Sequence, residues 1–104
     1  MERRLAAILV ADVVGYSHMI GIDEEGTLAT FKNLYDQTFS PLFSNYHGRL
    51  VKLMGDGILA EFSSAVDAVH AGIDIQKTLH EVNQSLLESQ KMVFRIGINM
   101  GDII

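Results

Sequence analysis

The feature that most constrains the fold is an uninterrupted apolar segment near the start of the chain, Leu5–Ala11, which ends at Asp12. Alternate residues of a strand point to opposite faces of a sheet, and here both sets are apolar. A short segment that is apolar on both faces is typical of a central strand. It is far shorter than the roughly 20 residues that a helix needs to cross a bilayer. We therefore predict a sheet built around residues 5–11, and no membrane segment.

The composition of the chain predicts a single globular domain over residues 1–104. Of the 104 residues, 48% are hydrophobic and none is cysteine. A chain of this size buries roughly two thirds of its unfolded surface, which is enough for one core. The absence of cysteine excludes a disulfide framework and thiolate catalysis. The net charge of −5, without a basic patch, argues against a nucleic-acid partner. We expect a cytoplasmic protein.

A long helical region is predicted after a loop over residues 13–22. Asp23 has the residue type of an N-cap, and acidic residues follow it in the first helical turn. Pro41 is expected to kink or restart this helix near Ser40, because proline removes an interior hydrogen bond. Gly48 is expected to end it. Aromatic residues run along the region at helical spacing and are expected in the core: Phe31, Tyr35, Phe39 and Phe43.

The second half of the chain predicts a hairpin, a helix and a final strand. Residues 49–54 and 58–62 flank Gly55–Gly57, and an Asp-Gly pair between such segments is a strong hairpin signal. A second helix is predicted over residues 64–84, and a half-buried strand over residues 92–100. The apolar stripe of the second helix is expected to comprise Val66, Val69, Ile73 and Leu79.

The element order β-α-β-β-α-β predicts an α+β fold of the ferredoxin-like type, with two helices on one face of a four-stranded antiparallel sheet. Right-handed crossovers give the spatial strand order 4-1-3-2. In this order the first strand ends at the sheet edge where the hairpin turns. Asp12 and Asp56, which are far apart in the sequence, are therefore predicted to be neighbours.

Two neighbouring carboxylates suggest a divalent metal site. Neither Asp12 nor Asp56 has a nearby cation in the sequence, and two such charges repel each other unless they are compensated. Hard oxygen ligands suit Mg²⁺ or Mn²⁺, with coordination positions left for water or substrate phosphates. The alternative is that Asp12 ends a strand and Asp56 is a turn residue.

Two further features add candidate contacts to a ligand at this edge. The segment Val13–Ser17 is short enough to aim backbone N–H groups at an anion, and Gly15 permits a close approach. Gly15 is alternatively an ordinary turn residue. Lys52 is expected on the same strand face as Leu50 and Met54, with its ammonium group available to a ligand. Its alternative role is to block aggregation at an edge strand.

Three ordered segments resemble the catalytic domain of class III adenylate/guanylate cyclases, and most of all the bacterial adenylate cyclases. They are residues 11–17 (ADVVGYS), 48–57 (GRLVKLMGDG) and 94–101 (FRIGINMG). The resemblance covers the whole chain. It implies cyclisation of ATP to 3′,5′-cyclic AMP and pyrophosphate, the reaction of a phosphorus-oxygen lyase in signal transduction, by a domain that acts as a homodimer.

The resemblance also implies roles for particular residues. Asp12 and Asp56 are the catalytic residues and bind two Mg²⁺ or Mn²⁺ ions, with help from the carbonyl group of Val13. Lys52 reads adenine and favours ATP, since guanylate cyclases usually carry Glu there. The implied substrate-binding set is Lys52, Gly55, Val14, Gly15, Tyr16 and Ser17.

The chain departs from the family at its end, where it stops at Ile104. The family domain continues and supplies a second base-reading residue, together with an Asn and an Arg that stabilise the transition state across a dimer. We therefore expect a truncated N-terminal portion that binds metal-nucleotide and is inactive alone. Three alternatives remain: a non-catalytic dimerisation module, a diguanylate cyclase, and a ferredoxin-like RNA binder. A G-G-D-E-F-like stretch is absent, and acidic charge disfavours RNA.

Overall fold

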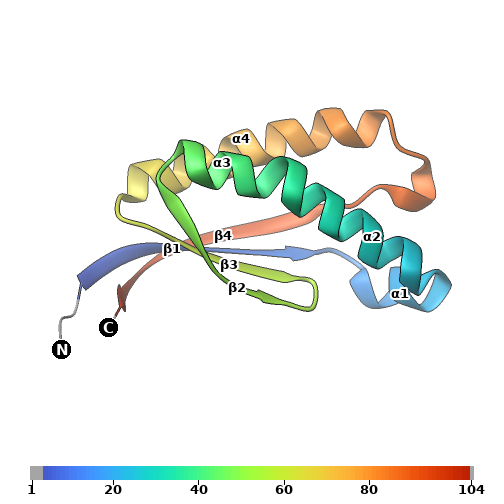
Figure 1. Cartoon of the computed structure of the whole chain (residues 1–104), viewed down its shortest axis with the longest axis horizontal. Helices are drawn as coiled ribbons and strands as arrows, with labels where there is room; N and C mark the ends of the chain where they lie inside the picture. Colours follow the sequence, from blue (N-terminus) through green and yellow to red (C-terminus); the bar gives the residue numbers. More distant parts are fainter. Residues whose placement is uncertain (1–3, 104) are drawn as a thin grey trace.

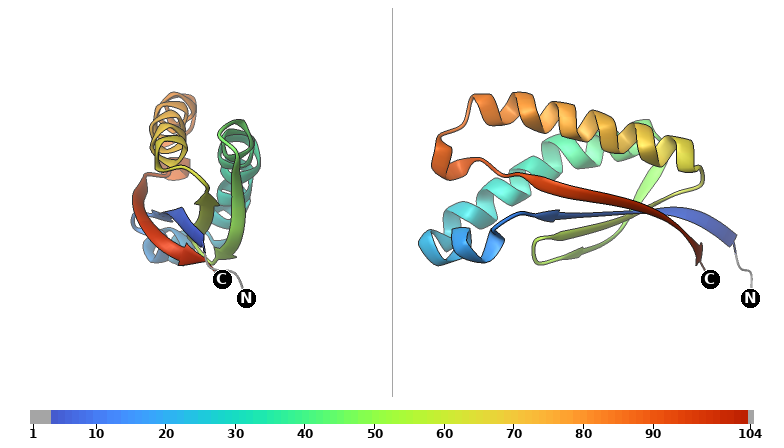
Figure 2. Two further views of the ribbon diagram at one scale, coloured as in Figure 1. Left: turned by 90° about the vertical axis from the view of Figure 1, so that its left-hand side faces the viewer. Right: turned by 180° about the vertical axis from the view of Figure 1, so that it is seen from behind.

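The computed structural model describes residues 4–103 and confirms the predicted fold class. A four-stranded antiparallel sheet has the order β2-β3-β1-β4, which is the predicted arrangement. The helices cover one face of this sheet (Figures 1 and 2). The opposite side, which we call the open face, has no helix over it in the described chain. The strands are β1 (Arg4–Val13), β2 (Gly48–Met54), β3 (Gly57–Phe62) and β4 (Phe94–Ile103).

The helical layer has two parts, one before the hairpin and one after it. The first comprises α1 (Tyr16–Ile22), α2 (Glu24–Leu34), a π-helical turn η1 (Tyr35–Phe39) and α3 (Ser40–Asn45). The second comprises α4 (Ala65–Gln84) and a 3₁₀ turn η2 (Glu88–Gln90). Within residues 4–103, no helix has the length and apolar character needed to span a bilayer.

The prediction of a loop over residues 13–22 was wrong, because α1 occupies most of that segment. Tyr16 and Met19 are three residues apart, so they lie on one helical face, where both pack against the core. Two residues at helical spacing are too few to identify a helix from the sequence. The structure therefore leaves only Val14 and Gly15 between β1 and α1.

The long helical region begins and breaks at the predicted positions. The side chain of Asp23 accepts a hydrogen bond from the N–H of Gly26 at 3.0 Å and caps α2. Pro41 lies in the first turn of α3, directly after the π-helical turn, as expected for a residue that cannot continue the α-helical pattern. His47, rather than Gly48, adopts the left-handed conformation after α3 (φ 62°). A side chain at Gly48 would instead collide with the ring of Phe62.

The core lies between the sheet and the helices. Leu9, Ala11, Ile58 and Phe62 of the two central strands are buried there. The aromatic residues predicted for the core pack against them, with Phe39 and Phe43 almost completely buried. The other side of β1 is only partly covered, since Val10 on the open face is 43% exposed. β1 is therefore central, as predicted, but it is not buried on both faces.

The predicted apolar stripe of α4 was largely wrong. Val66, Val69 and Ile73 are exposed, whereas Leu79 is buried. Small side chains face the sheet instead, because they allow the helix to approach it closely. The residues that α4 buries are Ala68, Ala71, Gly72, Ile75 and Leu79.

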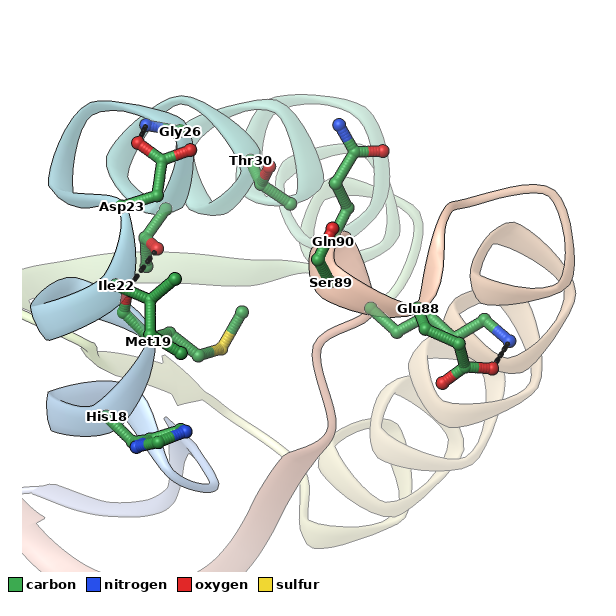
Figure 3. Close-up of a pocket in the computed structure, with 11 residues that line it drawn as sticks. His18, Met19, Ile22, Asp23, Gly26, Thr30, Glu88, Ser89 and Gln90 are labelled. Carbon is green, nitrogen blue, oxygen red and sulfur yellow. Dashed lines mark hydrogen bonds and ion pairs between the residues drawn. The ribbon is translucent and has the colours of Figure 1, made fainter.

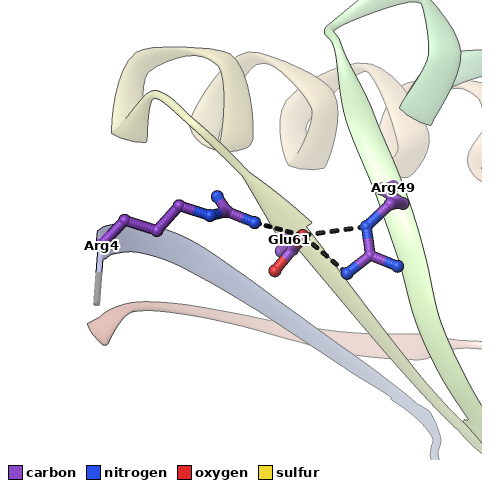
Figure 4. A network of polar contacts seen from close by, with 3 residues as sticks. All are labelled: Arg4, Arg49 and Glu61. Carbon is purple, nitrogen blue, oxygen red and sulfur yellow. Dashed lines mark hydrogen bonds and ion pairs between the residues drawn. The ribbon is translucent and has the colours of Figure 1, made fainter. Parts of the chain in front are cut away.

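A buried carboxylate joins three strands at the end of the sheet remote from Asp12. Oε1 of Glu61 on β3 lies 2.9 Å from Nη2 of Arg4 and 2.7 Å from Nη2 of Arg49 (Figure 4). The Glu61 side chain is only 5% exposed. Burial alone raises the pKa of its carboxyl group, but the hydrogen bonds from Arg49 and Arg4 outweigh burial and lower the pKa below its usual value.

We expect Glu61→Gln to lower the free energy of unfolding by about 1–3 kcal/mol at pH 7, because both guanidinium groups lose their anionic acceptor. A carboxyl group with a lowered folded-state pKa contributes stability above its unfolded pKa of about 4.3 and loses that contribution as pH falls through the folded value. Urea unfolding of both proteins at neutral and acidic pH should therefore show a difference that shrinks on acidification. Glu88→Gln, at an exposed ion pair, is the control. An equal loss at both pH values would contradict this account.

Candidate active site at the end of the sheet

The sheet brings Asp12 and Asp56 together, as the predicted topology requires. Asp12, near the end of β1, pairs across the ladder with Gly57, the residue that follows Asp56. Cα spacings across a ladder and along the chain then place the two aspartate Cα atoms within about 9 Å of each other. The Asp12 side chain is 40% exposed and Asp56 is half-buried, so both are accessible to a ligand.

A third charged residue, which the sequence analysis missed, lies in this site. Arg95 on β4 pairs across the ladder with Asp12, and its Nε donates to Oδ1 of Asp12 at 2.8 Å. The hydrogen bond and charge of Asp12, and more weakly the charge of Asp56, raise the pKa of the Arg95 guanidinium. The aspartate pair has no cation close to it in the sequence, but the fold supplies one in space. The compensating charge is 83 residues away in sequence, and only the pairing of β4 with β1 brings it close.

The backbone at the end of β1 directs an oxygen atom toward the same place. Val14 N–H donates to the carbonyl group of Val93, on the β4 side, at 2.8 Å. Successive residues of an antiparallel strand direct their N–H and C=O groups to opposite neighbours. The carbonyl group of Val13 therefore points to the other side of β1, toward β3 and Asp56. This is the position from which it could assist the two carboxylates in holding a cation.

The turn between β1 and α1 has the conformation that Gly15 was expected to allow. Gly15 adopts φ 72° and is the N-cap of α1, and a β-carbon there would meet no atom within 4 Å. Glycine is therefore favoured by the backbone conformation and not by crowding. The first N–H groups of a helix lack intrahelical partners. The N–H groups of Tyr16 and Ser17, in the first turn of α1, therefore have no partner within the helix and lie close to Asp12.

Lys52 shares a strand face with Met54, as predicted, but not with Leu50. A β-bulge between Leu50 and Lys52 shifts the register, so that Leu50 pairs with Ala60 and Lys52 pairs with Leu59. Leu50 therefore packs toward the core, whereas Lys52 points to the open face together with Asp12. β2 is also an edge strand, so both roles proposed for Lys52 remain compatible with its position.

The hairpin turn is displaced by one residue from the predicted Asp-Gly pair. Gly55 and Asp56 form the turn, and Gly57 is the first residue of β3. Gly55 has φ 57°, which favours glycine. Gly55 therefore lies in the hairpin turn at the end of the sheet that carries the candidate site.

The donor set fits a hard divalent cation that shares its ligands with a substrate. Across residues 4–103, no three His, Cys, Asp or Glu side chains converge on a common point. A cation at Asp12 and Asp56 would thus complete its coordination with the Val13 carbonyl group, water or substrate oxygens, as Mg²⁺ commonly does in phosphoryl-transfer sites.

A cavity of about 460 Å³ lies elsewhere, between α1, α2 and η2 (Figure 3). It is lined by residues such as His18, Thr30 and Gln90, and by none of the predicted site residues. The candidate active site is therefore a surface at the end of the sheet rather than part of this cavity.

The chain is similar in sequence and in fold to nucleotide cyclases. Over all 104 residues the chain is 41% identical to "Putative adenylate cyclase 3" of Rhizobium meliloti. An adenylate/guanylate cyclase/hydrolase from Silicibacter pomeroyi has 36% identity and a TM-score of 0.86 over 97% of this chain. The guanylyl cyclase Cya2 has 29% identity and a TM-score of 0.80 over 97% of this chain. No protein-family model matches the chain.

These similarities confirm the resemblance seen in the sequence. In sequence and in fold the chain is similar to part of adenylate/guanylate cyclase domains. It spans 18% of the length of the Rhizobium protein and 59% and 56% of the Silicibacter and Cya2 chains. The relatives include both adenylate and guanylate cyclases.

Proposed function

We propose that this chain is the metal- and nucleotide-binding portion of an adenylate cyclase domain, which in its complete form converts ATP to 3′,5′-cyclic AMP and pyrophosphate. The observation that carries this proposal is the convergence of Asp12, Asp56 and Arg95 at one end of the sheet, next to the turn before α1. Strand pairing assembles these groups from three distant parts of the sequence.

Asp12, Asp56 and the Val13 carbonyl group would hold two Mg²⁺ or Mn²⁺ ions. When bound, such ions supply Lewis acidity, both to lower the pKa of the ribose 3′-hydroxyl group and to neutralise charge on the triphosphate. The segment Val14–Ser17 would contact the triphosphate through backbone N–H groups, and Gly55 would let substrate approach the hairpin closely.

The positive charge of Arg95 gives it a role toward both the carboxylates and the triphosphate. Its guanidinium group donates to Asp12 and neutralises that carboxylate directly. Once cations compensate the two carboxylates, the guanidinium group no longer has to remain there, and its remaining N–H groups are available to phosphate oxygens. Arg95 thus links metal binding to triphosphate binding.

We expect Lys52→Glu, in a protein that contains the complete domain, to lower the ATP:GTP ratio of kcat/KM about tenfold or more. An ammonium group donates to N1 of adenine, whereas guanine presents an N–H group there and suits a carboxylate. Steady-state assays with each nucleotide measure the ratio. Lys77→Glu makes the same charge change on the exposed surface of α4 and is the control. An unchanged ratio would remove Lys52 from base recognition.

The competing function is a non-catalytic module that dimerises through the open face of the sheet. Val10 and Met54 are 43% exposed, which gives that face some apolar surface. We propose that the complete domain forms a homodimer, and that the function of the domain is to bind a nucleotide.

We also propose that the protein is located in the cytoplasm.

Titration of Mn·ATP into the purified chain, followed by calorimetry, separates the two functions. Our proposal requires saturable binding that depends on Mn²⁺. The competing module would show concentration-dependent dimerisation in analytical ultracentrifugation, without Mn·ATP binding, and that result would refute the proposal.

A further inference from the structure

The segment that leads into β4 is held at one point by the side chain of Asn83, in the last turn of α4. Nδ2 of Asn83 donates to the carbonyl oxygen of Met92 at 2.8 Å, and Oδ1 accepts from the N–H group of Met92 at 3.2 Å. Met92 is 1% exposed. Only an amide side chain donates and accepts in this way at neutral pH without adding charge. Asn83 therefore satisfies both backbone groups of a buried residue.

The residues after Met92 are tied in turn to the candidate active site and to α4. The carbonyl group of Val93 accepts from Val14 N–H at 2.8 Å, in the turn before α1. The carbonyl group of Phe94 accepts from Nε2 of Gln76 at 2.9 Å. Arg95 comes next and pairs with Asp12. The position of Met92 thus bears on both the phosphate-side turn and the arginine.

We propose that Asn83 is a positioning residue for this site, and this proposal rests on the proposed function. Asn83 contacts none of the predicted ligand-binding groups. Asn83 fixes Met92 and so restrains the adjacent Val93 carbonyl group, which accepts from Val14 N–H in the turn before α1. Fixing Met92 also restrains the start of β4, where Arg95 lies. Without it, residues 85–92 form a longer free connection between α4 and β4, which gains conformational freedom.

The first test measures amide hydrogen exchange in the purified chain without metal or nucleotide. Asn83→Ala should speed exchange of the Val14 and Met92 amides about tenfold, while the Leu9 amide in the centre of the sheet keeps its wild-type rate. Asn83→Asp retains the acceptor for Met92 N–H but sets its other carboxylate oxygen against the Met92 carbonyl oxygen, so it should speed Val14 exchange at least as much. A general structural role would instead change all three amides together.

The second test measures Mn·ATP affinity by calorimetry for the same variants. We expect Asn83→Ala to weaken binding about fivefold to tenfold, and Asn83→Asp to weaken it at least as much. Asn33→Ala, which removes an exposed amide from α2, should bind like the wild type.

The two measurements fail in distinguishable ways. A wild-type chain that does not bind Mn·ATP refutes the proposed function, and the role of Asn83 toward that site with it. Unchanged Val14 exchange in Asn83→Ala refutes the restraint itself. Faster Val14 exchange with wild-type Mn·ATP affinity refutes the link between the restraint and the site. Should Asn83→Ala not fold, Asn83→Asp carries both comparisons.

Discussion

Asp12→Asn and Asp56→Asn are each expected to weaken Mn²⁺ binding by the chain at least about a hundredfold. Both carboxylates lie at one end of the sheet, and no third His, Cys, Asp or Glu side chain in the described chain converges with them. Removing either charge therefore removes half of the anionic ligands, and a neutral amide oxygen is a weaker ligand for a hard cation. Isothermal titration with MnCl₂ measures the loss.

Two further variants sharpen this prediction. Asp36→Asn removes an exposed carboxylate on η1, remote from the site, and should leave Mn²⁺ affinity unchanged. Arg95→Gln should act in the opposite direction, since its guanidinium group competes with the cation for Asp12. It should raise the affinity for Mn²⁺ alone and lower the affinity for Mn·ATP. Wild-type Mn²⁺ binding by either aspartate variant would show that the two carboxylates share no site.

The neighbouring aspartates could be predicted because the sequence signals behind them are strong. The first strand ends at Asp12 and the hairpin turns at Asp56. Right-handed crossovers leave few possible orders for the strands of such a sheet. The predicted strand order placed both carboxylates at the same edge. Periodicity and turn chemistry are local properties, so a single sequence displays them directly.

Arg95 was missed because its role depends on the register between two strands. The strand order placed β4 beside β1, but nothing local to either strand indicates which residue of β4 faces Asp12. The clue was an arginine among the apolar residues at the start of the strand, Phe94 and Ile96. The register places this arginine on the open face, where Asp12 also lies.

The shared face of Lys52 and Leu50 and the apolar stripe of α4 were mispredicted for different physical reasons. One β-bulge, which strict alternation does not reveal, turned Lys52 to the face opposite Leu50. In α4, the large residues Val66 and Ile73 suggested the buried side, but close approach to the sheet selected small residues. Hydrophobicity alone did not separate these two faces.

The 104-residue polypeptide alone is expected to form no measurable cyclic AMP, even where it binds Mn·ATP. Charge that develops on the transferring phosphoryl group needs preorganised donors, and loss of one such donor costs on the order of 10²- to 10³-fold in rate. Arg95 is the one guanidinium group that the described residues place at the carboxylates. The resemblance to cyclases implies that an Asn and a second Arg come from parts of the domain outside these residues.

Self-association should not restore the reaction, because a symmetric dimer supplies only groups that each copy already has. Addition of a second polypeptide that carries the remaining part of a related cyclase domain should restore it, since the missing donors then come from the partner. The assay is cyclic AMP formation from Mn·ATP by the chain alone and by the mixture, with Asp12→Asn as the blank. Turnover well above that blank by the chain alone would place the transition-state donors within these 104 residues, and Arg95 would be the first of them to substitute.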